Sequence, residues 1–291
     1  MSSGPLVLGF PSYADAARRL AAKAALGYAD VVVHRFPDGE SQVRLPPALP
    51  DEVVFCVSLD RPNDKLVELE LAACAARDLG ARHLTLVAPY LCYMRQDMAF
   101  HPGEAVSQRI IGALLARHFE TVITVDAHLH RTAELSAAIP VPHALNLSAA
   151  GAIGDWLVAR GGRPVLLGPD EESAQWVREA AAAGHLDWGI AHKDRHGDRD
   201  VRVTLPGLDF AGRDVVLVDD VASTGHSLAA AARLLRDRGA GSIDVAVTHA
   251  LFVGDALDLL RDAGVNQIAS TDSVPHASNA LALDGLLAAA L

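Results

Sequence analysis

DVVLVDDVASTGHSLAAAA, residues 214–232, is the stretch that decides the fold class. It starts with an apolar, β-branched run and continues with two adjacent carboxylates, Asp219 and Asp220. Small residues follow at 223–225, and the alanine-rich end of the stretch is typical of a helix. Buried strands that turn directly into helices are the repeating unit of parallel α/β sheets. The stretch therefore predicts an α/β fold, with two acids where this strand ends.

Short apolar runs alternate with helical stretches along the whole chain. The runs that we expect to be strands are 5–10, 31–34, 53–58, 83–88, 121–125, 164–167, 188–192, 214–218, 243–248 and 265–270. The expected helices are 12–26, 63–79, 105–117, 148–160, 171–183, 226–238 and 254–263. Runs that are apolar on both faces and alternate with helices indicate parallel sheets covered on both sides.

The alternation is interrupted once, which suggests two domains. The segment 137–147 carries two prolines and fits neither pattern, and a chain of 291 residues is long enough for two medium-sized domains. We expect an N-terminal domain over 1–144, joined by the C-terminal helix 281–291, and a C-terminal domain over 145–280.

Charge and cysteine usage narrow the class of protein. The net charge of -11 argues against a general nucleic-acid or anionic-membrane binder, because those proteins present a basic face. The three cysteines, Cys56, Cys74 and Cys92, lie in apolar contexts without a CxxC pair, as buried thiols of a reducing compartment do. No signal-peptide or membrane-spanning pattern is present in the sequence, so a soluble cytoplasmic protein is expected.

The loop after the 214–218 run has the residue types of a sugar-phosphate site. Ser223, Thr224 and Gly225 precede a helix, whose free amides bind phosphate readily. Asp219 and Asp220 suit the hydroxyl groups of a sugar, or Mg²⁺ through water. Together they indicate a phosphorylated polyol. The alternative is a tight strand–helix turn with a capping hydroxyl and surface acids.

VLVDDVASTGHS resembles the phosphoribosyl-pyrophosphate-binding loop of type I phosphoribosyltransferases and of ribose-phosphate pyrophosphokinases. Further segments resemble only the second family, in chain order: FPDGE (36–40), PYLCYMRQD (89–97), TVDAHLH (124–130), GPD (168–170), HKDR (192–195), THALF (248–252) and TDSVPH (271–276). The short MAFHP segment after RQD resembles the archaeal-type branch. The resemblance implies two tandem type I phosphoribosyltransferase-like domains, each a mainly parallel sheet flanked by helices.

The resemblance also implies roles for individual residues. ATP would be bound by Phe36, Asp38, Glu40, Arg95, Gln96 and Asp97. Ribose 5-phosphate would be bound by Asp219, Asp220, Ser223, Thr224, Gly225, His226 and Ser227. Since the FPDGE segment of this family reaches a neighbouring subunit, a homo-oligomer of at least two chains is implied.

Metal binding and catalysis are implied at four further residues. His128 and Asp170 would hold Mg²⁺, although an imidazole is an unusual ligand for this ion, and Asp170 also suits the N-cap of the helix near 171. Lys193 and Arg195 would stabilise charge on the transferring group from a mobile loop. Without the other motifs their charged stretch would be interpreted as a solvated hairpin.

The implied activity is Mg²⁺-dependent transfer of the pyrophosphoryl group of ATP to ribose 5-phosphate. A non-catalytic regulatory homologue is an alternative, but Lys193, Arg195 and the acid pair are all present. A phosphoribosyltransferase for a nucleobase would share only the 214–228 loop. The same chemistry on another pentose phosphate is motivated by Ser223 and His226, where the loop departs from the common pattern.

Overall fold

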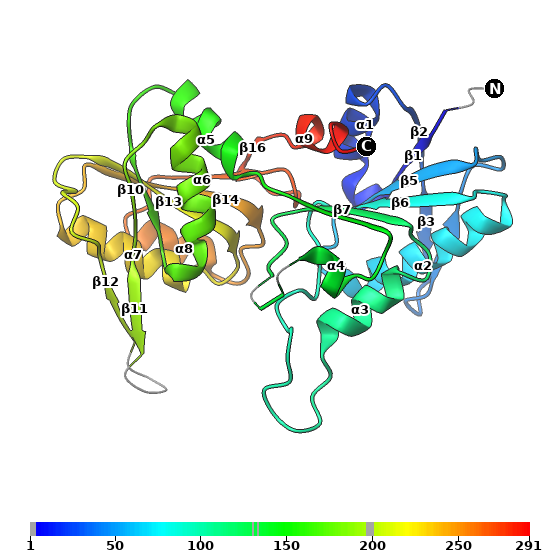
Figure 1. The fold of residues 1–291 in the computed structure, drawn as a ribbon, viewed down its shortest axis with the longest axis horizontal. Helices are drawn as coiled ribbons and strands as arrows, with labels where there is room; N and C mark the ends of the chain where they lie inside the picture. Colours follow the sequence, from blue (N-terminus) through cyan, green and yellow to red (C-terminus); the bar gives the residue numbers. More distant parts are fainter. Residues whose placement is uncertain (1–3, 130, 133, 196–200) are drawn as a thin grey trace. The chain divides into compact units, whose positions relative to one another are not determined.

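Parallel strand pairing organises both halves of the chain (Figure 1). The structure is a computed structural model that describes residues 4–129, 131–132, 134–195 and 201–291. It divides into unit 1, formed by residues 1–147 and 282–291, and unit 2, formed by residues 148–281. No helix within the described ranges is long and apolar enough to cross a membrane.

Unit 1 contains a six-stranded sheet with the strand order β2-β1-β5-β6-β7-β8, in which every neighbouring pair is parallel. Its strands are β1 (Leu6–Gly9), β2 (Gly27–Asp30), β5 (Glu52–Cys56), β6 (His83–Val87), β7 (Thr121–Val125) and β8 (His143–Leu147). Its helices are η1 (Pro11–Tyr13), α1 (Ala14–Lys23), α2 (Pro62–Asp78), α3 (Ser107–Leu115), α4 (Leu135–Ala138) and α9 (Asp284–Ala288). The C-terminal helix α9 packs against α1, so the chain ends in the unit in which it begins.

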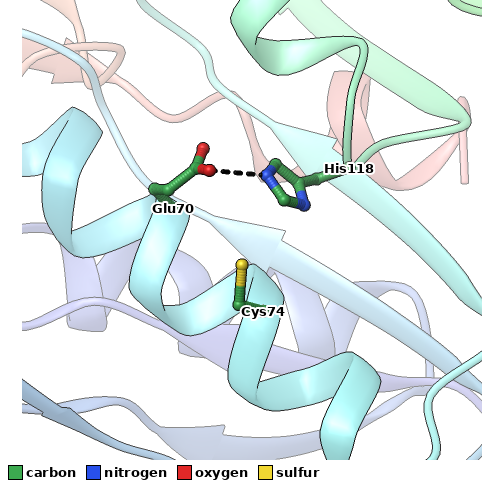
Figure 2. Close-up of side chains that lie close together, drawn as sticks. All are labelled: Glu70, Cys74 and His118. Carbon is green, nitrogen blue, oxygen red and sulfur yellow. Dashed lines mark ion pairs between the residues drawn. The ribbon is translucent and has the colours of Figure 1, made fainter.

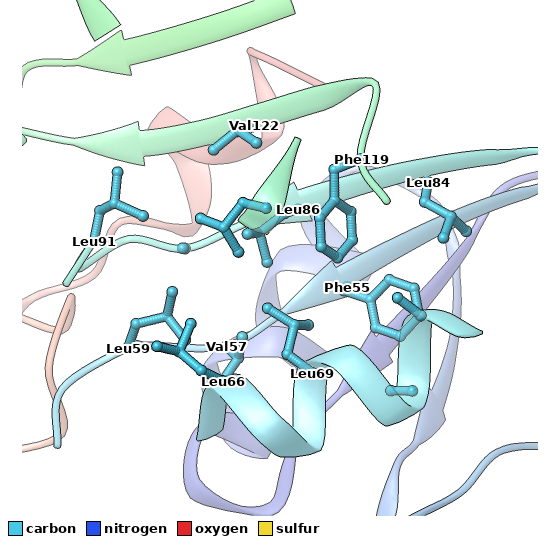
Figure 3. Packing of buried hydrophobic residues seen from close by; sticks show 14 of the residues in the cluster. Phe55, Val57, Leu59, Leu66, Leu69, Leu84, Leu86, Leu91, Phe119 and Val122 are labelled. Carbon is cyan, nitrogen blue, oxygen red and sulfur yellow. The ribbon is translucent and has the colours of Figure 1, made fainter. Parts of the chain in front are cut away.

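The core of unit 1 lies between the sheet and α2 (Figure 3). Phe55 stacks edge-on against Phe119 with ring centroids 5.8 Å apart. Leu66 and Leu69 of α2 pack against the strand residues. Apolar side chains continue past the end of β5, since Val57 and Leu59 are fully buried. Burial of this cluster is the main force that holds α2 to the sheet.

A separate hairpin leaves unit 1 between its second and third sheet strands. It consists of β3 (Val32–Arg35) and β4 (Ser41–Arg44), which pair antiparallel. Its end next to the 36–40 turn is fixed to α2, because Arg35 and Ser41 both donate hydrogen bonds to the buried carboxylate of Glu68, at 3.0 and 3.1 Å.

Unit 2 repeats this architecture, with the strand order β10-β9-β13-β14-β15-β16 and parallel pairing throughout. Its sheet strands are β9 (Val165–Gly168), β10 (Trp188–Ile190), β13 (Asp214–Ala222), β14 (Ser242–Ala250), β15 (Gln267–Thr271) and β16 (Asn279–Leu281). Its helices are α5 (Ala150–Ala159), η2 (Glu171–Ser173), α6 (Ala174–Gly184), α7 (His226–Asp237) and α8 (Ala256–Asp262). A hairpin of β11 (His192–Arg195) and β12 (Val201–Thr204) lies between its second and third strands in the chain.

The residues of β13 alternate between two cores. Val215 and Leu217 pack with the buried residues of α7 and α8, whereas Val216 and Val218 pack with those of α5 and α6. The sheet is therefore covered on both sides. This confirms the predicted α/β class with parallel sheets flanked by helices.

The structure corrects the sequence prediction at several places, including the following two. The segment 137–147 contains β8, which pairs with β7 from Thr121↔His143 to Val125↔Leu147, so it completes the first sheet. The strand predicted over 214–218 continues to Ala222, because its pairing with β14 extends to Ala222↔Ala250. Asp219 and Asp220 are therefore inside β13 and not beyond its end.

Candidate active site

The two acids of β13 lie among other negative groups. Asp220 is only 3% exposed and Asp219 is half-buried. Burial raises the pKa of the Asp219 carboxyl well above its usual value, and the charges of Asp220 and Asp170 raise it further. The amide of Asp220 donates to the Asp219 carboxylate at 3.0 Å. Such crowding of carboxylates is typical of a site that binds a cation or hydroxyl groups.

Asp170 reaches the same region from the neighbouring strand. It follows β9, which pairs parallel with β13, and its carboxylate accepts a hydrogen bond from the amide of Glu172 at 3.2 Å. That bond makes Asp170 the N-cap of η2. Asp170 therefore has the capping role that the sequence offered as an alternative to metal binding. Its charge also acts on Asp219, so a residue that caps η2 still belongs to the surroundings of the acid pair.

The turn from β13 into α7 exposes a helix N-terminus. Gly225 has φ +74°, a left-handed conformation that glycine adopts at little cost, and α7 begins at His226. The N-cap residue Gly225 offers this helix no side-chain hydrogen bond, although Ser223 and Thr224 directly precede it. The first amides of α7 therefore remain available to an anion. His226 is exposed and Ser227 is half-buried.

The predicted catalytic residues fall on the hairpin of unit 2. Lys193 pairs with Val203 and Arg195 with Val201 across the β11–β12 ladder. The charged stretch is thus a hairpin in its backbone. The side chains of Lys193 and Arg195 lie outside the part of the structure that is described.

The FPDGE segment forms the tip of the hairpin of unit 1. The Phe36 amide donates to the Glu40 carbonyl, and Gly39, at φ +94°, donates to the Phe36 carbonyl. Asp38 accepts from the Glu40 amide at 3.2 Å. Phe36 is 40% exposed, with its ring edge-on to His34 at 4.8 Å. The tip is thus a hydrogen-bonded turn with a partly exposed aromatic ring.

The RQD segment is tied to the loop that follows β7. Asp97 accepts hydrogen bonds from the amide and the guanidinium of Arg131, at 3.2 and 2.9 Å, and its side chain is only 2% exposed. Gln96 accepts a hydrogen bond from Ser107, while Arg95 is exposed. Among the three, only Arg95 presents its side chain fully to solvent. Asp97 has a positioning contact that the sequence did not reveal.

Gln108 strengthens the same link. It is buried, donates to the Met94 carbonyl at 3.2 Å and accepts from Thr132 at 3.0 Å. The sequence prediction missed both Gln108 and Arg131. The position of Arg131 near His128 was the only available signal, and side-chain contacts across loops leave no periodic pattern in a sequence.

His128 follows β7 and is half-buried. The backbone before it is fixed, because the Ala127 amide donates to the Asn146 side chain at 2.9 Å and the Asp126 amide donates to the Leu147 carbonyl at 2.8 Å. Asp126 has φ +40°, a conformation that is costly for a residue other than glycine. Such a backbone is typical of a functional loop at the carboxyl end of a parallel strand.

Comparison with known proteins agrees with this arrangement. Residues 6–118 match the family model for the N-terminal domain of ribose phosphate pyrophosphokinase, and residues 146–270 match that for the phosphoribosyl transferase domain. The ribose-phosphate pyrophosphokinase of Methanopyrus kandleri is 40% identical over 262 residues, covering 89% of each chain. Ribose-phosphate pyrophosphokinase 2 of Archaeoglobus fulgidus is 34% identical and covers 97% of this chain and 98% of its own. The chain belongs to the ribose-phosphate pyrophosphokinase family.

A solved structure supports the fold of this chain. The crystal structure of phosphoribosylpyrophosphate synthetase from Mycobacterium smegmatis matches with a TM-score of 0.82 and covers 99% of this chain and 97% of its own. Its sequence identity is 22%, so this match speaks for the fold. The archaeal relatives are more similar in sequence, which agrees with the predicted branch.

Proposed function

We propose that this member of the ribose-phosphate pyrophosphokinase family transfers the pyrophosphoryl group of ATP to the anomeric hydroxyl of ribose 5-phosphate. The products are AMP and 5-phosphoribosyl 1-pyrophosphate, a precursor in nucleotide biosynthesis. One observation carries the proposal: the acids of β13 are followed within a few residues by the uncapped start of α7. Acids for hydroxyl groups and amides for a phosphate thus lie along one short turn.

The sugar phosphate is assigned to this turn of unit 2. Asp219 and Asp220 accept hydrogen bonds from the ribose hydroxyls. The 5-phosphate is bound by backbone amides and side chains of residues 223–227, namely Ser223, Thr224, Gly225, His226 and Ser227. The exposed His226 adds a hydrogen-bond donor. Two adjacent carboxylates match the vicinal hydroxyls of a pentose, and the family match favours ribose 5-phosphate among the pentose phosphates.

The oxygen-rich donor set of unit 2 fits a magnesium ion. Mg²⁺ prefers carboxylate ligands, and a divalent cation would relieve the repulsion that raises the pKa of Asp219. We assign Asp170 to this ion, and we propose His128 as a metal ligand of unit 1. When bound, the ion would neutralise negative charge on the phosphates of ATP.

The transfer itself needs positioning and charge stabilisation more than a dedicated base. The anomeric oxygen forms a bond to the β-phosphorus of ATP, and the bond from that phosphorus to the α–β bridging oxygen breaks. The hydroxyl proton is lost to solvent and the bridging oxygen leaves with AMP. Lys193 and Arg195 are assigned to the negative charge that develops on the transferring group.

The nucleotide is assigned to unit 1. Phe36 stacks on adenine, Asp38 and Glu40 contact the nucleotide, and Arg95 and Gln96 bind the phosphates. Asp97 acts there by holding Arg131 and the RQD loop. We also propose that the exposed hairpin tip serves a neighbouring subunit in a homo-oligomer, and that the enzyme works in the cytoplasm, outside membranes and without nucleic acid.

AMP release coupled to a spectrophotometric signal tests the proposal. With ATP, Mg²⁺ and ribose 5-phosphate, the purified chain should release AMP only when the sugar is present. Asp220→Asn should abolish this signal, whereas Asp237→Asn, at an exposed acid at the end of α7, should preserve it. Lack of sugar-dependent AMP would overturn the proposal, and faster release with another pentose phosphate would overturn the substrate assignment.

A further inference from the structure

Three metal-ligating side chains meet on unit 1 away from the proposed active site (Figure 2). Glu70 and Cys74 lie one helical turn apart on α2, so both point from the same face of the helix. His118 comes from the loop between α3 and β7. It precedes the amino end of β7, whereas His128 follows the carboxyl end, so the two histidines lie at opposite ends of this strand.

The donor atoms of these side chains are already close. One atom each from Glu70, Cys74 and His118 lie within 4.8 Å of one another. His118 Nε2 approaches Glu70 Oε1 at 2.9 Å. Nε2 is buried, yet among the described residues it has no hydrogen-bond partner with acceptable angles, Glu70 included. The 2.9 Å approach is close enough for an ion pair with Glu70, but it makes no well-aligned hydrogen bond, so this buried ring nitrogen is only partly satisfied beside a carboxylate and a thiol (Figure 2).

The histidine is held in place by its backbone. The His118 carbonyl accepts a hydrogen bond from Arg77 of α2 at 2.8 Å, and its amide donates to the Leu115 carbonyl at 3.1 Å. The next residue, Phe119, is buried in the core. His118 therefore has little freedom to swing away from α2, and the site is largely preformed.

We propose that Glu70, Cys74 and His118 bind a zinc-class transition metal ion. A thiolate combined with an imidazole favours Zn²⁺ and related ions over Mg²⁺ and Ca²⁺, which prefer oxygen ligands. Ligand atoms of a tetrahedral zinc site lie about 3.5 Å apart, given metal–ligand distances of about 2.0–2.3 Å. Small rotamer changes of the exposed Cys74 and the half-buried Glu70 bring the present cluster to that size. A water molecule would complete the coordination.

One neighbouring cation competes with the metal for the Glu70 carboxylate. The guanidinium of Arg117 lies 3.2 Å from Glu70 Oε1, the same oxygen that faces His118. The metal therefore has to displace this pair or use the other carboxylate oxygen. Because Arg117 is exposed and its ion pair is screened by solvent, the opposition is weak. Removing the charge should tighten metal binding.

The site would act as a staple. It would join α2 to the loop that enters β7, two segments far apart in the sequence. Binding to the folded state alone stabilises that state in proportion to the logarithm of the free metal concentration. The proposed ion thus supports unit 1 without contacting the substrates.

Cobalt titration of the full chain tests the proposal. With Mg²⁺ in large excess, Co²⁺ should produce a thiolate-to-metal charge-transfer band and the strong visible bands of a tetrahedral site. Cys74→Ser should abolish the charge-transfer band, and His118→Gln and Glu70→Gln should each weaken zinc binding at least about tenfold, since even supporting residues typically contribute that much. Arg117→Gln should strengthen it severalfold. His101→Gln is the matched control. His101 also pairs with a glutamate, at 2.6 Å, but it does not belong to the cluster that contains the thiol.

Two further readouts keep the test independent of folding defects. Zn²⁺ should raise the melting temperature of the parent chain but not that of Cys74→Ser, whose metal-free melting temperature should match that of the parent. Zn²⁺ should also slow alkylation of Cys74, the exposed thiol among the three free cysteines. A thiolate band that survives Cys74→Ser, or alkylation that zinc leaves unchanged, would overturn the proposal.

Discussion

The two units of this chain have the same strand topology, but their loops have diverged. In each unit the sheet order is second, first, third, fourth, fifth and sixth strand, and a hairpin leaves the chain between the second and third strands. Each first strand ends in a glycine that has no room for a side chain: a Cβ at Gly9 would lie 2.5 Å from Tyr28, and one at Gly168 would lie 2.2 Å from Ser173. The scaffold was therefore kept in both units.

The strand-pairing registers of the two sheets show which residues differ between the units. The third and fourth strands start as a pair in both units, Glu52↔His83 in unit 1 and Asp214↔Ser242 in unit 2. Counted from this pair, Val57 and Ser58 of unit 1 take the positions that Asp219 and Asp220 take in unit 2. Both residues of unit 1 are buried. Unit 1 uses these positions for packing, as Figure 3 shows for Val57. Unit 2 uses them for a polar site.

The turns that follow these positions also differ between the units, because only the turn of unit 1 is neutralised by a side chain of its own helix. The residue before the helix is left-handed in both units, Arg61 at φ +47° and Gly225 at φ +74°. In unit 1, Lys65 donates to the Ser58 carbonyl at 2.8 Å and to Asp60 at 2.6 Å. A cation of the chain itself thus neutralises the loop of unit 1. The corresponding loop of unit 2 has acids in the strand and an uncapped helix, as expected if a ligand completes it.

Removing a cation from the hairpin of unit 2 should have the largest effect. Lys193→Ala and Arg195→Ala should each lower kcat about 10²–10³-fold, the range found for groups that stabilise transition-state charge. The matched change in the hairpin of unit 1, Arg44→Ala, should leave kcat within about threefold. Steady-state kinetics with both substrates measure this. Equal losses from both hairpins would show that the two are not functionally distinct.

Replacing Asp219 of unit 2 by valine, the residue at the matching position of unit 1, should have opposite effects on stability and activity. Asp219→Val should lower kcat/KM for ribose 5-phosphate about 100-fold, because a hydroxyl acceptor is lost. The same change should raise the melting temperature at pH 7, since burial and neighbouring charges destabilise the ionised carboxylate. Thermal unfolding alongside the AMP assay measures both quantities. A variant that loses stability as well as activity would contradict the comparison.

The two helix-entry turns offer a smaller, reciprocal test. Gly225→Ala should destabilise the protein by about 1–2 kcal/mol, the usual cost of a left-handed conformation for an L-residue. It should also raise KM for ribose 5-phosphate. Arg61→Gly should instead stabilise the protein by up to about 1 kcal/mol, because it relieves the same strain in unit 1. Chemical denaturation monitored by circular dichroism reports both changes, and the opposite signs would contradict the assigned strain.

The smallest expected effect concerns a half-buried acid in the fourth strand. Asp244 takes the register position of Thr85 in unit 1, and burial raises the pKa of its carboxyl above the usual 3.8. An acid with a raised pKa destabilises the fold as pH rises through that pKa, so Asp244→Thr should raise the melting temperature slightly at pH 7. The gain should vanish below about pH 3, where the carboxyl is protonated in both states. A gain that does not change with pH would point to packing instead.

The sequence alone determined the elements and the family. Apolar runs that alternate with helical stretches predicted the parallel sheets, because each strand and helix carries its own local pattern. The ordered motifs around residues 36–40 and 214–228 indicated the family, since contiguous loops leave contiguous signatures. Both inferences depend on residues that are close together in the chain.

Only the tertiary structure decided how distant residues are combined. Strand β8 was hidden by Pro140 and Pro142, which lie just outside it, and its role appears only in its pairing with β7. The continuation of β13 past its acids depends on β14, and the contact of Asp97 with Arg131 joins two loops. The cluster of Glu70, Cys74 and His118 arises in the same way, because packing brings together side chains that share no local pattern.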